Sequence, residues 1–365
     1  MKKFSVFLSL VLIVSLLAGC AGTPVIYHED CTCPTNDSAA VQTPTEGASE
    51  PTETPVTATG ALKTGLAIVT NVKDSKDAAA DAEGEASFDV TIVAVLVDEN
   101  GVIQDCIIDG IKAAVKFDAE GAISTDLTVA PQTKNELGEN YNMVKYGGAI
   151  AEWDAQAAAL AEFAVGKTVE ELKNGAIDET GYAPEGSDLA SSATIYLGGY
   201  VSAIEAAAAN AQALGAQAGD ELKLAVNTGI SSSKAADAEN AGLAQLDVDA
   251  AVLTMNGETI TSCVIDAAQA KVNFDTEGKI TSDISAAVQT KNQLGENYNM
   301  VKYGGAIAEW NEQAASFAAY VTGKTAAEVA GIAVDESTHP TDADLVSSVT
   351  IAIGGFQALI AKACG

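Results

Sequence analysis

Residues 132–153 read QTKNELGENYNMVKYGGAIAEW and residues 289–310 read QTKNQLGENYNMVKYGGAIAEW, so one position in 22 differs. The flanking segments also correspond, for example VKFD at 115–118 and VNFD at 272–275. Self-similarity of this length indicates a duplicated unit of about 150 residues rather than a short solenoid repeat. We therefore expect one domain over residues 62–215 and a second over residues 219–365.

The first part of each copy has the pattern of a β-meander. Phe88, Val90 and Ile92 alternate with Asp89 and Thr91, which is the period of a half-buried strand. The dipeptides at 100–101 and 256–257 are both Asn-Gly, which favours a type I′ hairpin turn. Segments 102–108 and 113–117 are expected to form two further strands.

Helices follow the strands. Ile150, Trp153, Ala157 and Leu160 share one face of a predicted helix that Gly166 ends, and Trp153 is expected in the core. A capping box begins a short second helix in each copy, and a last helix is expected over residues 196–214. The fold class is therefore α+β, an antiparallel β-meander with packed helices. The capping boxes pair Thr168 with Glu171 and Thr325 with Glu328.

The N-terminus has the features of an exported, lipid-anchored protein. Two lysines precede an apolar run over residues 4–18, which is too short for a comfortable membrane span and fits a signal peptide over residues 1–19. The run ends Leu-Ala-Gly-Cys, which resembles the bacterial lipobox, so Cys20 is the expected site of a diacylglycerol anchor with an added palmitate. Residues 20–61 are rich in Pro and Thr and predict a disordered tether with a mean span of about 35 Å. The expected location is the extracellular face of the cell membrane.

Composition excludes several kinds of function. A net charge of −31 disfavours nucleic acid as a partner. The chain has 2 His and no Cys-x-x-Cys pair, so neither a metal site nor thiol redox chemistry is expected. Cys106 and Cys263 occupy matching positions in apolar runs and are expected to be buried. Because the motifs of hydrolases, P-loop proteins and dinucleotide-binding enzymes are absent, the sequence favours a carrier over an enzyme and suggests no catalytic residue.

A short signature occurs late in each copy, as DLASSAT at 188–194 and DLVSSVT at 344–350. It predicts a turn of small residues that presents a Thr hydroxyl near a helix N-terminus, where a phosphate is favoured. Two helix N-caps without any modification are the alternative. The candidate residues are Asp188, Ser191, Ser192 and Thr194 in the first copy, and Asp344, Ser347, Ser348 and Thr350 in the second.

The segment that is nearly identical in both copies mixes polar, aromatic and Gly residues before a helix. This composition suits a loop that wraps a planar anionic ligand, because aromatic rings and Met offer flat polarisable surfaces and Lys offers charge. A structural turn, or recent gene conversion of the stretch, is the alternative. The candidate contacts are Tyr141, Asn142, Met143 and Lys145 in the first copy and Tyr298, Asn299, Met300 and Lys302 in the second, with Tyr146 and Tyr303 nearby.

The signature resembles the flavinylation motif of FMN-binding domains, in which a flavin transferase moves FMN from FAD onto the Thr hydroxyl as a phosphoester. With the lipobox, the tether and the two copies, the chain is similar to tandem FMN-binding-domain lipoproteins of Gram-positive extracellular electron transfer. It departs from the family pattern at Ser192 and Ser348, which replace a Gly, and at Val349, where the family prefers Ala. The attachment site at Thr350 departs further than the one at Thr194.

The resemblance implies an electron-transfer flavoprotein with two covalent FMN groups. Electrons would arrive from a membrane quinone pool reduced by an NADH dehydrogenase, and would leave to ferric iron or soluble flavins. A FAD-dependent flavin transferase is an implied partner. A non-redox binding lipoprotein for a solute or wall polymer is the main alternative, and a dedicated surface reductase is another.

Overall fold

The computed structural model describes residues 60–365. The expected signal peptide, Cys20 and all but the last two residues of the tether lie outside the described residues. Both copies belong to one compact unit. Within residues 60–365, no helix combines the length and apolar character that crossing a membrane requires.

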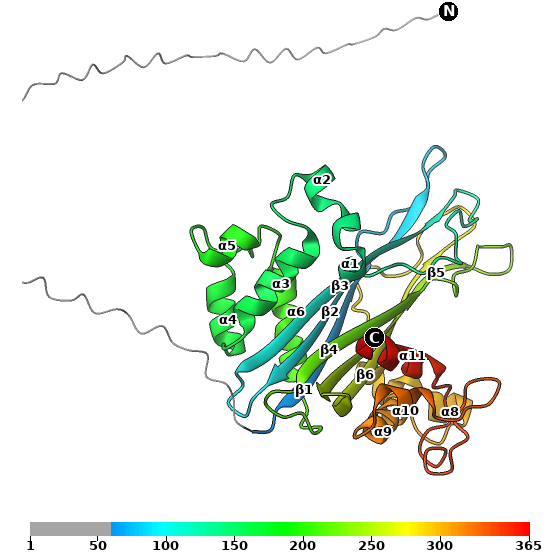
Figure 1. Ribbon diagram of the computed structural model, residues 1–365. Helices are drawn as coiled ribbons and strands as arrows, with labels where there is room; N and C mark the ends of the chain where they lie inside the picture. Colours follow the sequence, from blue (N-terminus) through cyan, green and yellow to red (C-terminus); the bar gives the residue numbers. More distant parts are fainter. Residues whose placement is uncertain (1–59) are drawn as a thin grey trace, which may run out of the picture. The chain divides into compact units, whose positions relative to one another are not determined.

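Each copy has three antiparallel strands in sequential order, followed by helices (Figure 1). The mixed α+β class and the β-meander are confirmed. The first copy contains β1 (Lys63–Asn71), β2 (Gly84–Val97), β3 (Ile103–Phe117), α1 (Lys134–Leu137), the 3-10 turn η1 (Gly138–Tyr141), α2 (Met143–Gly147), α3 (Trp153–Ala164), α4 (Val169–Ala176), α5 (Asp188–Ser192) and α6 (Gly198–Ala209). The second contains β4 (Glu221–Gly229), β5 (Gly242–Asn256), β6 (Thr259–Phe274), α7 (Lys291–Leu294), η2 (Gly295–Tyr298), α8 (Met300–Gly304), α9 (Trp310–Val321), α10 (Ala326–Ala330) and α11 (Gly354–Cys364).

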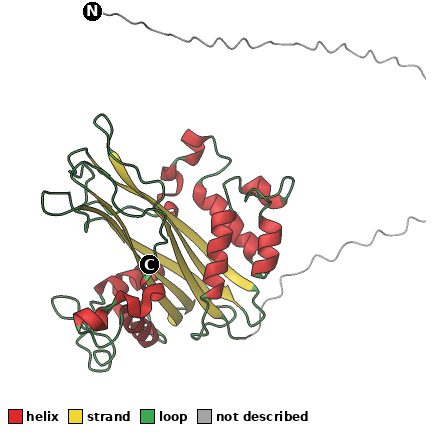
Figure 2. Ribbon diagram, turned by 180° about the vertical axis from the view of Figure 1, so that it is seen from behind, coloured by secondary structure: helices red, strands yellow, loops and turns green. Residues whose placement is uncertain are grey.

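The two sheets pack face to face, and the helices cover their outer faces, so the strands lie between two groups of helices (Figure 2). The alternating residues of β2 explain this layering. Val90, Ile92 and Leu96 point into a core that both copies share, whereas Val93 and Val95 point toward the helices of the first copy. Because both faces of each sheet are buried, the strands have apolar residues on both sides.

The shared core is held together by an aromatic pair and by buried hydroxyls. Phe117 of β3 and Phe274 of β6 stack with ring centroids 4.0 Å apart and planes at 2°. At the edge where β1 meets β6, the Thr64 hydroxyl lies 2.7 Å from that of Ser262, which lies 2.7 Å from that of Thr254. All three hydroxyl-bearing residues are fully buried, so their mutual hydrogen bonds offset the cost of removing them from water.

Several expectations about the strands are corrected. Segments 102–108 and 113–117 are not two strands, because β3 runs without interruption and Gly110 pairs with Thr91 in an unbroken ladder. Gly110 is needed there for space, since a Cβ would lie 3.3 Å from Lys134 Cδ and 3.4 Å from the Trp153 ring. The first strand of each copy, β1 or β4, was not expected from the sequence at all.

The turns and helix bounds also differ from the expectation. The Asn-Gly dipeptides do not form type I′ turns, because only the glycines, Gly101 at φ 80° and Gly257 at φ 60°, have positive φ. Ile150 lies before α3 and is 55% exposed. The last helix of the first copy ends at Ala209 rather than 214, because the chain then pairs with β1 through Gln212.

Other local expectations are confirmed. Both capping boxes are present, at Thr168 with Glu171 and at Thr325 with Glu328. Gly166 follows the end of α3 with φ 81°. Trp153, Cys106 and Cys263 are buried, and burial raises the pKa of both thiols, which keeps them protonated and unreactive.

Candidate functional site

The repeated segment begins at a buried carboxylate on the neighbouring strand. Asp109 of β3 accepts hydrogen bonds from the backbone N–H of Gly110 at 2.7 Å and of Asn135 at 3.1 Å, and the Asn135 amide donates to the Ile108 carbonyl at 3.0 Å. These bonds fix the start of α1 against the sheet. Burial raises the pKa of Asp109 and of its counterpart Asp266, the latter to about 6. The counterpart bonds in the second copy join Asp266 to Ala267 and Asn292, and Asn292 to Ile265.

A buried lysine packs between aromatic rings next to this anchor. Lys134 is 6% exposed, and its Nζ lies 4.7 Å from the centroid of Trp153 and 5.5 Å from that of Tyr141. Burial lowers the pKa of Lys134, while the nearby Asp89 carboxylate favours its charged form. Tyr141 and Met143 pack against the apolar core on this side. The second copy repeats the arrangement with Lys291 over Trp310 and Tyr298.

The segment then turns outward at Asn142, whose φ is 62°. The Glu152 carboxylate accepts hydrogen bonds from the first N–H groups of α2, at 2.8 Å from Met143 and 3.1 Å from Val144. Lys145 and Tyr146 project into solvent, and Tyr146 is 77% exposed. In the second copy Asn299 and Glu309 take the same roles for α8, and Lys302 lies beside Tyr303, which is also 77% exposed.

The signature residue Thr194 is held by a buried glutamine on α3, the helix that begins directly after Glu152. Gln156 of α3 is fully buried, and its Oε1 accepts hydrogen bonds from Thr194 N at 2.8 Å, Ile195 N at 3.2 Å and Thr194 Oγ1 at 3.3 Å. Its Nε2 donates to the Ala151 carbonyl at 2.8 Å. In the second copy Gln313 holds Thr350 in the same way, at 2.8, 3.2 and 3.2 Å.

Glu152 and Gln156 lie one helical turn apart, so the two sequence candidates meet at the start of α3. The repeated segment is bound by Glu152 and the signature by Gln156. The sequence analysis missed both residues. Two features of the sequence could have identified them. A polar side chain recurs at the same place in both copies, and Gln156 falls on the apolar face of α3 beside Trp153 and Ala157.

The remaining signature residues shape the turn. Ser191 and Ser192 donate back to the Asp188 and Leu189 carbonyls at 2.6 and 3.3 Å, and Asp188 is exposed at the first position of α5. In the second copy the same residues form turns without a helix. There Ser347 and Ser348 donate to the Asp344 and Leu345 carbonyls, at 3.2 and 3.3 Å.

The alternative that the signature threonines are helix N-caps is wrong, and the first turn of the helix that follows does not contain them either. Leu197 is the N-cap of α6 and Ile353 that of α11, three residues after each Thr. Thr194 and Thr350 are instead exposed residues in an extended connection.

The site has the space and chemistry for a phosphoester-linked group. A Cβ built on Gly199 or Gly355 would meet no atom within 4 Å, whereas one on Gly198 would lie 2.5 Å from the Tyr196 hydroxyl and one on Gly354 3.0 Å from Thr338, so the region after each Thr is open on one side only. An ester at Thr194 Oγ1 removes only the longest of the three bonds to Gln156 and leaves both N–H bonds in place. The Thr hydroxyl can therefore carry an ester without loss of the two backbone bonds that hold the connection.

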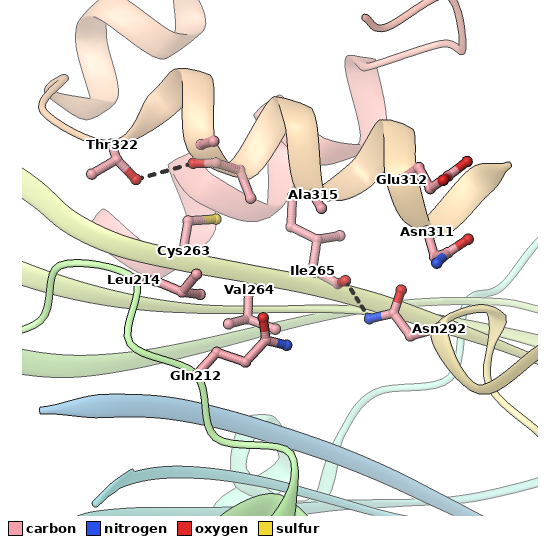
Figure 3. A pocket seen from close by; sticks show the side chains of 12 residues that line it. Gln212, Leu214, Cys263, Val264, Ile265, Asn292, Asn311, Glu312, Ala315 and Thr322 are labelled. Atoms are coloured by element: carbon pink, nitrogen blue, oxygen red, sulfur yellow. Dashed lines mark hydrogen bonds between the residues drawn. The ribbon is translucent and has the colours of Figure 1, made fainter. Parts of the chain in front are cut away.

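The structure also has two grooves that are lined by neither Thr194 nor Thr350. One of about 540 Å³ runs between β6 and α9 and is lined by Cys263, Ile265 and Ala315, among others (Figure 3). Its counterpart between β3 and α3, about 620 Å³, is lined by Cys106, Ile108 and Ala158 at the matching positions. Neither groove is lined by a residue that the sequence analysis selected as a candidate cofactor contact.

Comparisons of the chain with protein-family models, with curated proteins and with solved structures found no match.

Proposed function

We propose that this protein is a membrane-anchored electron carrier with two FMN groups, one esterified to Thr194 and one to Thr350, and that each copy is an FMN-binding-type domain. One observation carries the proposal. In both copies, an exposed Thr at the end of the same signature is held through its backbone by a fully buried Gln. A buried polar side chain that bonds the backbone at the signature Thr and at the residue after it fixes the position of that Thr in both copies.

Attachment is a group transfer from FAD catalysed by a flavin transferase. Thr194 Oγ1 attacks the phosphorus that carries riboflavin, a P–O bond to the threonine forms, the bond to AMP breaks, and the hydroxyl proton is released. Gln156 holds the backbone of the nucleophile through two N–H bonds that do not depend on the hydroxyl, so the site stays ordered before and after the reaction. A bound flavin supplies one- and two-electron redox chemistry that the protein side chains lack.

Retention explains why a covalent bond is useful here. A cofactor that dissociates outside a cell is diluted away, and the exposed Thr positions offer no enclosed cavity to hold it. Tethered through Cys20, the carrier would accept electrons from a quinone-linked NADH dehydrogenase and pass them to ferric iron or soluble flavins. The strong negative charge of the chain is compatible with attracting ferric ions.

Intact mass tests the attachment directly. The chain is coexpressed with a flavin transferase, and we expect two FMN adducts, one after Thr194→Val or Thr350→Val, and none after both. Thr180→Val is the matched control, since Thr180 is an exposed Thr near the signature that bonds to Asp178, and it should keep both adducts. Two adducts in the double variant, or none in the parent chain, would refute the proposal. Loss of the protein from membranes after Cys20→Ser tests the anchor.

One observation favours the alternative of a non-redox binding lipoprotein. Val144, Tyr146 and Ile150 are 45%, 77% and 55% exposed, and their counterparts in the second copy have the same values. Such repeated exposed apolar side chains mark a binding surface as readily as a cofactor contact. That function predicts a colourless protein even when the transferase is present.

A further inference from the structure

The surroundings of Thr194 contain an aromatic pair that those of Thr350 lack. Tyr182 and Tyr196 pack edge to face with ring centroids 5.6 Å apart and planes at 80°, yet both remain about half exposed, at 45% and 53%. Tyr196 lies only two residues after Thr194 in the chain. A pair of large rings that is neither in the core nor fully solvated leaves flat apolar surface beside the attachment site.

Two glycines make room for this pair. A Cβ on Gly181 would lie 2.4 Å from Tyr196 Cε2, and a Cβ on Gly198 would lie 2.5 Å from the Tyr196 hydroxyl. The Gly181 carbonyl also accepts hydrogen bonds from Leu197 N at 2.8 Å and Gly198 N at 3.0 Å, which joins the Tyr182 segment to the Tyr196 segment. The ring positions are therefore fixed by the backbone.

The second copy has the same backbone connection, but other side chains occupy the space beside it. The Thr338 carbonyl accepts from Ile353 N at 2.9 Å, so Thr338 stands where the first copy has Gly181. A Cβ on Gly354 would lie 3.0 Å from the Thr338 side chain, which means that Thr338 fills the space that Tyr196 fills in the first copy. His339 and Ala352 replace the two tyrosines, and His339 Nδ1 turns to Asp335 at 3.4 Å.

We propose that the Tyr182–Tyr196 pair is a binding surface for an isoalloxazine ring, present at the Thr194 site and absent at the Thr350 site. This inference rests on the proposed function, because the ring in question is that of the flavin esterified to Thr194. Two residues of extended chain span at most about 7 Å, a distance that a ribityl phosphate chain can bridge. Edge-to-face and offset contacts with the two rings suit a planar aromatic group.

The two flavins are consequently not equivalent. A flavin on Thr194 has one face covered by tyrosine rings, whereas a flavin on Thr350 is surrounded by Thr338, His339 and small side chains. Covering one of its two faces reduces the access of a dissolved molecule to the ring. The difference assigns a shielded site to the first copy and an open site to the second.

The test uses two full-length chains with one flavin each, Thr350→Val and Thr194→Val, with the single adduct verified by mass. Quenching of flavin fluorescence lifetime is measured with iodide and with neutral acrylamide, which separates access from charge. Access is compared through the bimolecular quenching constant, which is the Stern–Volmer constant divided by the unquenched lifetime, because a nearby tyrosine also shortens that lifetime. We expect this constant to be smaller at the Thr194 site with both quenchers. Tyr196→Ala should raise it to the value of the Thr350 site, whereas the control Val129→Ala, which shortens an exposed side chain in a distant loop, should not change it.

A variant that creates the tyrosine pair in the second copy distinguishes loss of the pair from a local folding defect. Thr338→Gly, His339→Tyr and Ala352→Tyr together, in the Thr194→Val chain, should build the pair in the second copy and lower the constant there. Equal constants for the two sites, or no response to either set of substitutions, would overturn the inference while leaving the adducts, and thus the proposed function, intact. Absence of adducts would overturn both.

A freely diffusing flavin is the other source of the same ring. The chain with both Thr194→Val and Thr350→Val is titrated with FMN, and binding is followed by fluorescence anisotropy. Binding that Tyr196→Ala abolishes would assign the pair to a soluble flavin instead of the attached one, and would overturn the inference as stated. We expect no saturable binding.

Discussion

Removing the Phe274 ring should destabilise both copies together, although the residue belongs to the second. Phe274 is fully buried and stacks on Phe117 of the first copy at 4.0 Å. Gly242 lies directly against the Phe274 ring, since a Cβ there would come within 2.3 Å of it. Because glycine has no side chain, it cannot fill the space that truncation of Phe274 leaves. Phe274→Ala should therefore cost about 3–5 kcal/mol of the free energy of unfolding.

The two tryptophans provide a separate probe for each copy. Trp153 lies in the first copy and Trp310 in the second, and both are buried. With Trp310→Phe as the background, Trp153 fluorescence reports unfolding of the first copy alone. If the denaturant slope is about 3 kcal/mol per M of urea, Phe274→Ala should shift the midpoint of this signal by about 1 M or more.

A second substitution, in the outer layer of the second copy, tests whether the copies unfold as one unit. Phe317 is fully buried, belongs to the hydrophobic cluster between the second sheet and its helices, and packs against Phe356 with ring centroids 5.4 Å apart. If the copies unfold as one unit, Phe317→Ala should also shift the Trp153 transition. The Trp310 signal is read in the reciprocal background, Trp153→Phe. If Phe274→Ala shifts the midpoint of Trp310 in that background but leaves the midpoint of Trp153 unchanged in the other, the claim that the shared core couples the copies is refuted.

Three further predictions concern single residues. Because the pKa of Asp266 is raised from 3.8 to about 6, the native state binds its proton more tightly than the unfolded state, so the stability from this group is present below about pH 4 and is lost as pH rises through 6. Asp266→Asn should therefore flatten the fall of urea midpoints between pH 4 and 6, and an unchanged slope would contradict the assignment. Gln156→Leu leaves two backbone N–H groups without their acceptor, which should cost about 1–3 kcal/mol and reduce FMN occupancy at Thr194 but not at Thr350, as read by peptide mass mapping. Thr338 has φ 63°, a conformation that costs an L-residue about 1–2 kcal/mol, so Thr338→Gly should raise the melting temperature slightly, and a lower value would count against strain there.

The duplication and the order of strands could be predicted because they depend on local patterns. Alternation at Phe88, Val90 and Ile92 identifies a strand whatever it packs against. The same alternation does not say what lies opposite, and these residues turn out to face the other copy rather than their own helices. Sequence periodicity reports burial, and a sheet buried on both faces gives no indication of which partner covers which face.

The candidate site was predictable in part, for a similar reason. Thr194 and the repeated segment were identified by their recurrence, but the side chains that join them were not. Glu152 and Gln156 are ordinary polar helix residues in a one-dimensional pattern, and only the fold shows that one is fully buried. Gly110 misled the strand assignment because its role, making room for Lys134 and Trp153, comes from side chains distant in sequence.

The face-to-face packing of the two sheets sets the distance between the two signature threonines. Adjacent layers are about 10 Å apart, so the helical layer that holds Thr194 and the one that holds Thr350 are separated by about 30 Å of dry hydrocarbon and paired backbone. Such a barrier insulates one prosthetic group from the other. If both threonines carry flavin, each flavin would exchange electrons with its own donor or acceptor molecule. The two flavins would then act independently, on opposite sides of the protein.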